Sequence, residues 1–147
     1  YRPQTATEEE RKLVDAIGPL AGKTIAVLGI AFKPNTDDIR EAPAVDVIRR
    51  ILQSGASVRA FDPVAMPAAA ATPALSDVHY AQDPYDAASG ADALLIMTEW
   101  NEFRELDLPR LRGLLRNAII VDSRNVYPLE KMRDAGFRYA SVGRRTV

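Results

Sequence analysis

Thr24-Ile25-Ala26-Val27-Leu28 is an unbroken apolar run, and it leads into the polar loop Gly29-Ile30-Ala31-Phe32-Lys33-Pro34-Asn35-Thr36-Asp37-Asp38-Ile39-Arg40-Glu41-Ala42-Pro43. Such a run is typical of a strand buried on both faces of a parallel sheet, and residues 45–52 then follow a helical pattern. In open α/β folds the loop between strand and helix lies at the carboxyl edge of the sheet, where ligands bind. The sequence therefore predicts a ligand site on this loop.

The rest of the chain repeats the alternation of strands and short helices. Further strands are predicted at 57–61, 78–80, 93–97, 118–121 and 137–140, and further helices at 7–17, 83–88, 102–115 and 129–135. Residues 64–76 are rich in Ala and Pro and are predicted to form a mobile surface excursion with about one helical turn. The alternation indicates an α/β fold, namely a three-layer, doubly wound, Rossmann-like parallel sheet of about five strands.

Composition excludes several classes of function. The 147 residues suit one domain, and 19 basic against 20 acidic residues leave a net charge of −1, which argues against nucleic-acid and anionic-membrane partners. The chain has no cysteine, so disulfides and cysteine nucleophiles are excluded within it.

No apolar run approaches the ~20 residues that span a bilayer, and no signal peptide is seen, so a cytoplasmic location is expected. The absence of a starting Met and the first segment, Tyr1-Arg2-Pro3-Gln4, suggest a piece of a longer protein.

Three linked motifs carry a family resemblance. The segment 32–43 closely resembles the signature that opens the carboxyl-terminal domain in the UDP-glucose/GDP-mannose dehydrogenase family. Its residues are most similar to those of the UDP-glucose 6-dehydrogenases. Thr98-Glu99-Trp100-Asn101-Glu102-Phe103 is similar to the family's Thr-Glu-Trp segment. Val121-Asp122-Ser123-Arg124-Asn125 is similar to its Asp-Gly-Arg-Asn segment, with Ser123 in place of the usual glycine. Order and spacing also match, so the resemblance covers roughly residues 20–147.

The resemblance implies a UDP-sugar-binding domain at 21–147, preceded by a helical segment of the inter-domain connection at 1–20. It implies that the whole enzyme oxidises UDP-glucose to UDP-glucuronate with two NAD, and that the reaction uses a cysteine outside this chain. The product would be used in polysaccharide biosynthesis. NAD would be bound mainly by an amino-terminal domain of the same protein, and the full enzyme would be a homodimer. A GDP-mannose or UDP-N-acetylhexosamine dehydrogenase and a non-catalytic nucleotide-sensing module remain alternatives.

Candidate binding residues follow from the same motifs. Arg124, two positions beyond a buried strand, can pair with a phosphate or span sugar hydroxyls, or it can form an ion pair with Asp122 or another nearby acid. Lys33 can reach an anion or lie free on the surface. By resemblance, Phe32, Lys33 and Arg124 contact the UDP-sugar, and Arg40 reaches the NAD of the amino-terminal domain. For Arg40, an ion pair with Asp37 or Asp38 is the alternative.

Other polar residues favour structural roles. Asp37 and Asp38 have no histidine nearby, so we expect no metal site and predict that they cap the next helix or order Arg40. Asp62 stands where dinucleotide folds place a ribose-binding acid, but the first turn has one glycine and no Gly-x-Gly-x-x-Gly. Asp62 is therefore predicted to form a turn with Pro63. Trp100 either shapes the pocket or covers the sheet edge. No catalytic residue is predicted in this chain.

Overall fold

A computed structural model describes residues 7–147, and the segment from Tyr1 to Gln4 lies outside the described part. The helices are α1 (Glu8–Ile17), α2 (Pro43–Gln53), α3 (Met66–Ala70), α4 (Pro84–Ala88), α5 (Leu108–Leu114) and α6 (Leu129–Asp134), with short 3₁₀ turns η1 (Pro73–Leu75) and η2 (Asn101–Glu105). The strands are β1 (Thr24–Leu28), β2 (Ser57–Phe61), β3 (His79–Tyr80), β4 (Ala93–Ile96), β5 (Ile119–Asp122) and β6 (Arg138–Ala140).

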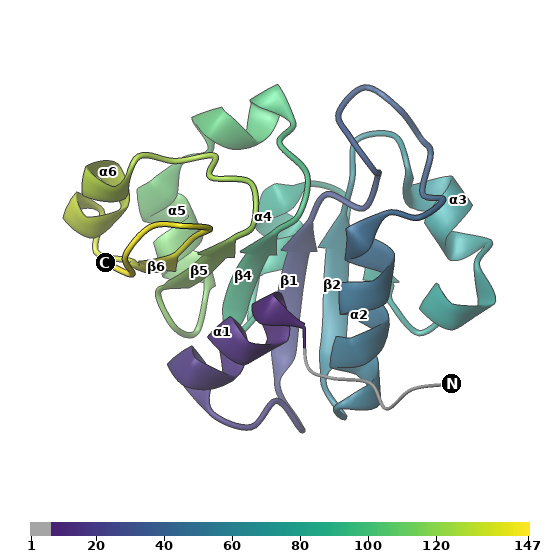
Figure 1. Cartoon of the computed structure of the whole chain (residues 1–147), viewed down its shortest axis with the longest axis horizontal. Coiled ribbons are helices and arrows are strands. Elements are labelled where there is room, and N and C mark those ends of the chain that lie inside the picture. Colours follow the sequence, from purple (N-terminus) through teal and green to yellow (C-terminus); the bar gives the residue numbers. More distant parts are fainter. Residues whose placement is uncertain (1–6) are drawn as a thin grey trace.

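The strands form one parallel sheet in the order β3-β2-β1-β4-β5-β6 (Figure 1). This is the doubly wound order of Rossmann folds, with β1 and β4 on either side of the point where the strand order reverses. The predicted α/β fold is confirmed. The sheet has six strands where about five were predicted, because the short strand predicted at 78–80 also forms, as β3, and pairs with β2.

Helices cover both faces of the sheet, with α1 and α2 in front and α4 and α5 behind in the view of Figure 1. The central strand explains the two cores. Ile25 and Val27 face a core that includes Leu13 of α1 and Ile48 of α2, whereas Ala26 and Leu28 face the opposite core. Because β1 is apolar on both faces, it can lie only between two covering layers.

The Ala- and Pro-rich segment is more structured than the sequence indicated. Residues 66–70 and 73–75 form α3 and η1, and Ala65, Ala69 and Leu75 are fully buried in the first core. The predicted helical turn is confirmed as α3, whereas the prediction of a surface excursion is wrong for the buried residues Ala65, Ala69 and Leu75. Alanine packs closely without a large apolar side chain, so its burial leaves only a weak signal in the sequence.

Gly29 allows the ends of β1 and β4 to approach closely. Its φ of +93° lies in the left-handed region, and a Cβ at this position would lie 2.5 Å from both Cβ and Oγ1 of Thr98. The Thr98 hydroxyl donates to the Ala31 carbonyl over 2.8 Å. The space that a side chain would fill is thus occupied by a residue that ties the two loops together.

A buried polar network lies beneath the end of β5. The fully buried Asp122 accepts hydrogen bonds from the backbone N–H of Arg124 (2.9 Å) and of Val126 (2.7 Å) and from the Tyr139 hydroxyl (2.5 Å). Arg144 Nη2 donates to the same hydroxyl over 2.9 Å. Burial raises the pKa of the Tyr139 phenol, and the hydrogen bond to Asp122 acts in the same direction. The network fixes the backbone on which Arg124 is carried.

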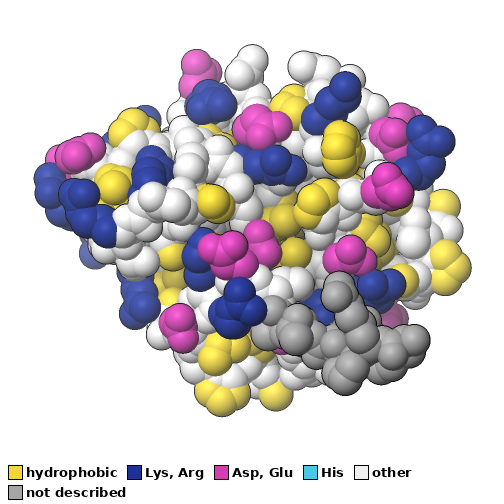
Figure 2. Space-filling model, viewed as in Figure 1, with side chains coloured by type: hydrophobic (Ala, Val, Ile, Leu, Met, Phe, Trp, Pro, Cys, Tyr) yellow, Lys and Arg dark blue, Asp and Glu magenta, His cyan; other side chains and the backbone are white. Residues whose placement is uncertain are grey.

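The face of the molecule in Figure 2 carries no patch of a single charge sign among the described residues. On the face shown in Figure 2, basic and acidic side chains are interspersed over the part not covered by grey atoms, in keeping with the net charge of −1. Among residues 7–147, no helix is long and apolar enough to cross a membrane.

Gly29→Ala should destabilise the protein more than Gly22→Ala, which is a matched control. Gly22 also has a left-handed φ, +79°, but a Cβ there would meet nothing within 4 Å. We expect Gly22→Ala to lower the free energy of unfolding by about 1–2 kcal/mol through backbone strain alone. Gly29→Ala should lose about 1–3 kcal/mol more through the clash with Thr98. Urea denaturation measures both, and equal losses would contradict the close approach of the two loops.

Tyr139→Phe should cost stability in a pH-dependent way. Near pH 8 the loss should be about 1–3 kcal/mol, because Asp122 loses a donor and Arg144 Nη2 loses its acceptor. The folded-state pKa of Tyr139 is raised, so its stabilising contribution is full below the unfolded pKa of about 10 and is lost as pH rises towards the folded pKa.

The difference between parent and Tyr139→Phe should therefore narrow above about pH 10. Denaturation curves at several pH values between 8 and 11 measure it. A difference that stays constant with pH, or that is absent at pH 8, would refute the network.

Candidate functional site

The ends of three strands are aligned at one edge of the sheet. Backbone hydrogen bonds continue the ladder past the strands, from Met97 N to Leu28 O (2.9 Å) and from Ser123 N to Ile96 O (3.0 Å). The loops after β1, β4 and β5 therefore leave the sheet side by side, at the top of Figure 1. This is the edge at which open α/β sheets bind ligands.

The loop after β1 is closed on itself and displays two of the predicted residues. Phe32 N donates to Asp38 O over 2.9 Å, and Asn35 turns the chain with a left-handed φ of 65°. Lys33 is exposed, and its ammonium group has no hydrogen-bond or ion-pair partner within residues 7–147. Phe32 is 49% exposed. An unpaired cation beside an exposed ring is suited to hold an anionic, partly planar ligand.

Arg40 lies near the carboxyl end of the same loop and pairs with Asp38. Its Nε and Nη2 donate to the two carboxylate oxygens over 3.0 and 3.1 Å, and its side chain is 89% exposed. The hydrogen bonds from Arg40 lower the pKa of Asp38 to about 2. The ion-pair alternative for Arg40 is thus realised, and the prediction that Asp38 orders Arg40 is confirmed. Asp38 does not cap α2, because the residue before that helix is Ala42 and has no side-chain cap.

Arg124 turns back across the end of β4. Its Nε donates to the Met97 carbonyl over 2.9 Å and lies 3.8 Å from Glu99 Oε2. The side chain is 30% exposed, and Nη1 and Nη2 have no protein partner among residues 7–147. The ion pair is made with Glu99 and not with Asp122, whose carboxylate holds the Arg124 backbone instead. The guanidinium is held by one edge and offers the other, which matches a bidentate acceptor such as a phosphate.

Hydrogen bonds across the loops link these residues. Thr98 binds the carbonyl of Ala31, the residue before Phe32, and Arg124 binds the carbonyl of Met97, the residue before Thr98. The structure thus places Phe32 and Lys33 on the loop adjoining the segment that holds Arg124. Arg40 and Phe32 also line an open depression of about 430 Å³ with Asp38 and Glu41.

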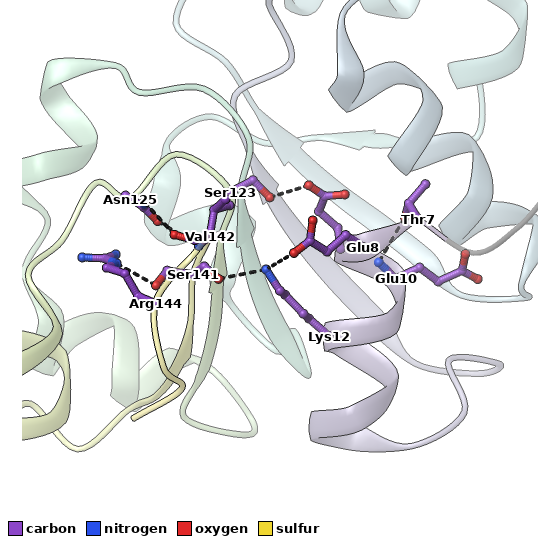
Figure 3. Close-up of polar contacts among 10 residues, drawn as sticks. Thr7, Glu8, Glu10, Lys12, Ser123, Asn125, Ser141, Val142 and Arg144 are labelled. Carbon is purple, nitrogen blue, oxygen red and sulfur yellow. Dashed lines mark hydrogen bonds and ion pairs between the residues drawn. The ribbon is translucent and has the colours of Figure 1, made fainter.

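Helix α1 is attached to the loop after β5 (Figure 3). The Ser123 hydroxyl donates to Glu9 Oε2 over 2.7 Å, and Lys12 Nζ donates to the Ser141 carbonyl over 2.8 Å. Leu13 of the same helix is fully buried in the core. Ser123, which replaces the glycine expected from the resemblance, therefore carries a contact to α1. The division at residue 20 between a connecting helix and the binding domain stays a prediction.

Asp62 has a role that the sequence did not reveal. The predicted turn is confirmed, because Asp62 Oδ1 accepts from the N–H groups of Val64 (2.9 Å) and Ala65 (2.8 Å). Its other oxygen also accepts from Ile30 and Ala31 on the loop after β1. An acid directly after β2 was the only signal for this contact.

Trp100 is the residue before η2 and is buried, which favours the predicted covering role over an exposed position in a pocket. It is 7% exposed, and it belongs to the second core together with Phe103. Within residues 7–147 we find no group of three or more His, Cys, Asp or Glu residues arranged to hold a metal ion.

Comparison with known proteins agrees with this geometry. The chain is 46% identical over 136 residues to UDP-glucose 6-dehydrogenase TuaD of Bacillus subtilis (strain 168), which covers 92% of this chain and 29% of that protein. It is 47% identical over 135 residues to UDP-glucose 6-dehydrogenase of Rhizobium meliloti (strain 1021), covering 91% and 30%. A solved structure of a UDP-glucose dehydrogenase from the hyperthermophilic archaeon Pyrobaculum islandicum matches with a TM-score of 0.72 and 35% identity, over 88% of this chain and 27% of that one.

The chain thus spans about 30% of the length of these curated relatives. Residues 26–129 match the UDP binding domain of the UDP-glucose/GDP-mannose dehydrogenase family, and this stretch contains the loops after β1, β4 and β5. By this match, the chain belongs to the UDP-glucose/GDP-mannose dehydrogenase family, as its UDP binding domain.

Proposed function

We propose that this chain binds the UDP part of UDP-glucose within an NAD-dependent UDP-glucose 6-dehydrogenase, which oxidises UDP-glucose to UDP-glucuronate. The observation that carries the proposal is the guanidinium of Arg124 at the carboxyl edge of the sheet, which uses Nε for contacts within the protein and leaves Nη1 and Nη2 for a ligand. The relatives at 46–47% identity are named UDP-glucose 6-dehydrogenases, which favours this substrate over GDP-mannose or a UDP-N-acetylhexosamine.

In this proposal the residues of the site divide the work of holding the substrate. Arg124 pairs with the diphosphate or the sugar hydroxyls through Nη1 and Nη2, while Met97 and Glu99 fix its orientation through Nε. Lys33 supplies a second positive charge from the neighbouring loop, and Phe32 offers an apolar surface. Since Lys33 and the outer edge of Arg124 have no hydrogen-bond or ion-pair partner within residues 7–147, binding an anion breaks no existing ion pair at these atoms.

The residues present do not fit NAD at the end of β1. A dinucleotide fold needs free backbone N–H groups and closely spaced glycines at that turn. Here Gly29 is followed by Ile30 and Ala31, whose N–H groups are already bonded to Asp62. We propose that NAD is bound mainly by an amino-terminal domain, and that Arg40, exposed on the loop, reaches it only after giving up part of its pairing with Asp38.

The proposal also assigns the covalent chemistry elsewhere. Oxidation of an alcohol to a carboxylate in two steps needs a nucleophile that can carry an acyl group, and this chain has no cysteine. The 147 residues alone should be inactive. The amino-terminal domain, residues 1–20 as the connection to it, a homodimeric assembly and a cytoplasmic location all belong to the proposed whole enzyme.

The 147-residue chain should bind UDP weakly and NAD hardly at all. The reason is that Arg124 and Lys33 are open to a diphosphate, whereas Arg40 alone cannot hold a dinucleotide. Isothermal titration calorimetry with each ligand measures both. Binding of NAD tighter than that of UDP would reverse the assignment of the site.

Arg124→Ala in the full-length enzyme should raise the KM for UDP-glucose about ten- to a hundredfold, because it removes a charge-assisted pair of about 1.5–3 kcal/mol. Lys33→Ala should act in the same direction. Arg133→Ala is a matched control, since Arg133 lies in α6 and pairs with Asp134. Steady-state kinetics with UDP-glucose measures all three, and unchanged kinetics for Arg124→Ala and Lys33→Ala would rule out the site.

A further inference from the structure

The Asp62 carboxylate is an unusual buried charge. Its side chain is completely buried, and Oδ2 accepts hydrogen bonds from Ile30 N (2.7 Å) and Ala31 N (3.0 Å). Oδ1 accepts from Val64 N (2.9 Å) and Ala65 N (2.8 Å). In the described part of the chain no Lys or Arg pairs with Asp62, so four backbone N–H groups alone hold the anion. Converging backbone N–H groups of this kind are how proteins bind phosphate.

The position of these N–H groups in the fold is informative. Ile30 and Ala31 follow β1 directly after Gly29, at the turn where a dinucleotide fold directs its backbone towards a diphosphate. In such folds the acid that ends β2 contacts a ribose hydroxyl. Here that acid turns inward and binds the first loop itself. The carboxylate therefore stands where the phosphate of a dinucleotide would need to be.

We propose that Asp62 is a built-in anion that fills the diphosphate position at the end of β1. It excludes dinucleotides from this position and fixes the base of the Phe32–Lys33 loop, so that a nucleotide is directed towards Arg124. The direction of a nucleotide towards Arg124 rests on the proposed function. The exclusion of dinucleotides and the fixing of the loop base rest on the contacts of Asp62 alone. Asp62 acts as a positioning and specificity-determining residue, since it reaches the ligand only through the loop.

Two further contacts support this role. The backbone of Ala31 is held at both of its peptide groups, because its N–H donates to Asp62 and its carbonyl accepts from Thr98. Moreover, burial raises the pKa of Glu102, which lies in η2, and the negative charge of Asp62 raises this pKa further. The charge of Asp62 is thus felt at this edge of the sheet, and a second anion at the end of β1 would be repelled.

The test is chemical rescue of Asp62→Ala, which frees the four N–H groups. The melting temperature (Tm) is measured by circular dichroism in sodium formate, sodium phosphate, sodium pyrophosphate and sodium chloride at equal ionic strength. In chloride, Asp62→Ala should melt roughly 5–15 °C below the parent. Formate should restore most of this loss with a saturable concentration dependence, and pyrophosphate should also stabilise the variant. The parent should not respond to formate beyond the effect of chloride, and pyrophosphate should raise the Tm of the parent less than that of the variant, because in the parent it can bind only at Arg124 and Lys33.

Asp92→Ala is the matched control. Asp92 accepts one backbone hydrogen bond, from Thr24 N over 2.9 Å, at the opposite end of β1. Its variant should lose stability without recovery specific to formate. An Asp62→Ala protein that responds equally to formate and chloride, or the same recovery in Asp92→Ala, would overturn the proposal. So would pyrophosphate stabilising the parent as much as the variant.

A second variant and a second ligand keep the test decisive. If Asp62→Ala does not fold in chloride, it should fold in formate, and failure in both would also overturn the built-in anion. Asp62→Asn fills the position with a neutral group, so it should be destabilised yet show no recovery in formate; recovery there would count against the proposal.

UDP titrations then separate the role of Asp62 from the proposed function. Anion rescue without UDP binding by the parent would retain Asp62 and reject the proposed function, whereas UDP binding without anion rescue would do the reverse.

Discussion

The two hydrogen bonds on the backbone of Ala31 are the constraint on which the site depends. Asp62, from the end of β2, accepts its N–H, and Thr98, from the end of β4, donates to its carbonyl. Three strand ends are thereby joined at one residue, which directly precedes Phe32. Only glycine at position 29 permits this, because any Cβ there would collide with Thr98. The long loop that follows can therefore leave the sheet in one defined direction.

The same arrangement explains how a Rossmann-like sheet can serve a nucleotide without the glycine-rich turn. In a dinucleotide fold the backbone after the first strand is left unsatisfied until the diphosphate binds it. In this chain the fold satisfies that backbone internally, with Asp62. In the proposed function, recognition then depends on side chains of the neighbouring loops, Lys33 and Arg124, whose outer donors have no hydrogen-bond or ion-pair partner within residues 7–147. The same proposal places the ligand away from the end of β1, because its donors are side chains of the loops and not the backbone after that strand.

Much of the fold could be predicted because each buried strand is a distinct apolar run, as in residues 24–28 and 93–96. The local pair Asp38–Arg40 was also predictable, since the two residues are two apart. The contact from Asp62 to Ile30 was not, because it spans 32 residues and depends on which backbone groups face each other after folding. The burial of Ala65 and Ala69 was missed for another reason, since alanine occurs both in protein cores and on exposed helices.

Helix α1 adds a connection that the motifs alone do not contain. Glu9 accepts from Ser123, the residue before Arg124, and Lys12 binds the carbonyl of Ser141 near the chain end (Figure 3). On its other side, Glu10 pairs with Arg50 of α2 over 3.1 Å. The helix is thus held both to the body of the domain and to the loop that carries Arg124. Any displacement of α1 must either break the Glu9–Ser123 hydrogen bond or move that loop, so the geometry of the binding edge depends on a segment that precedes the sheet in the chain.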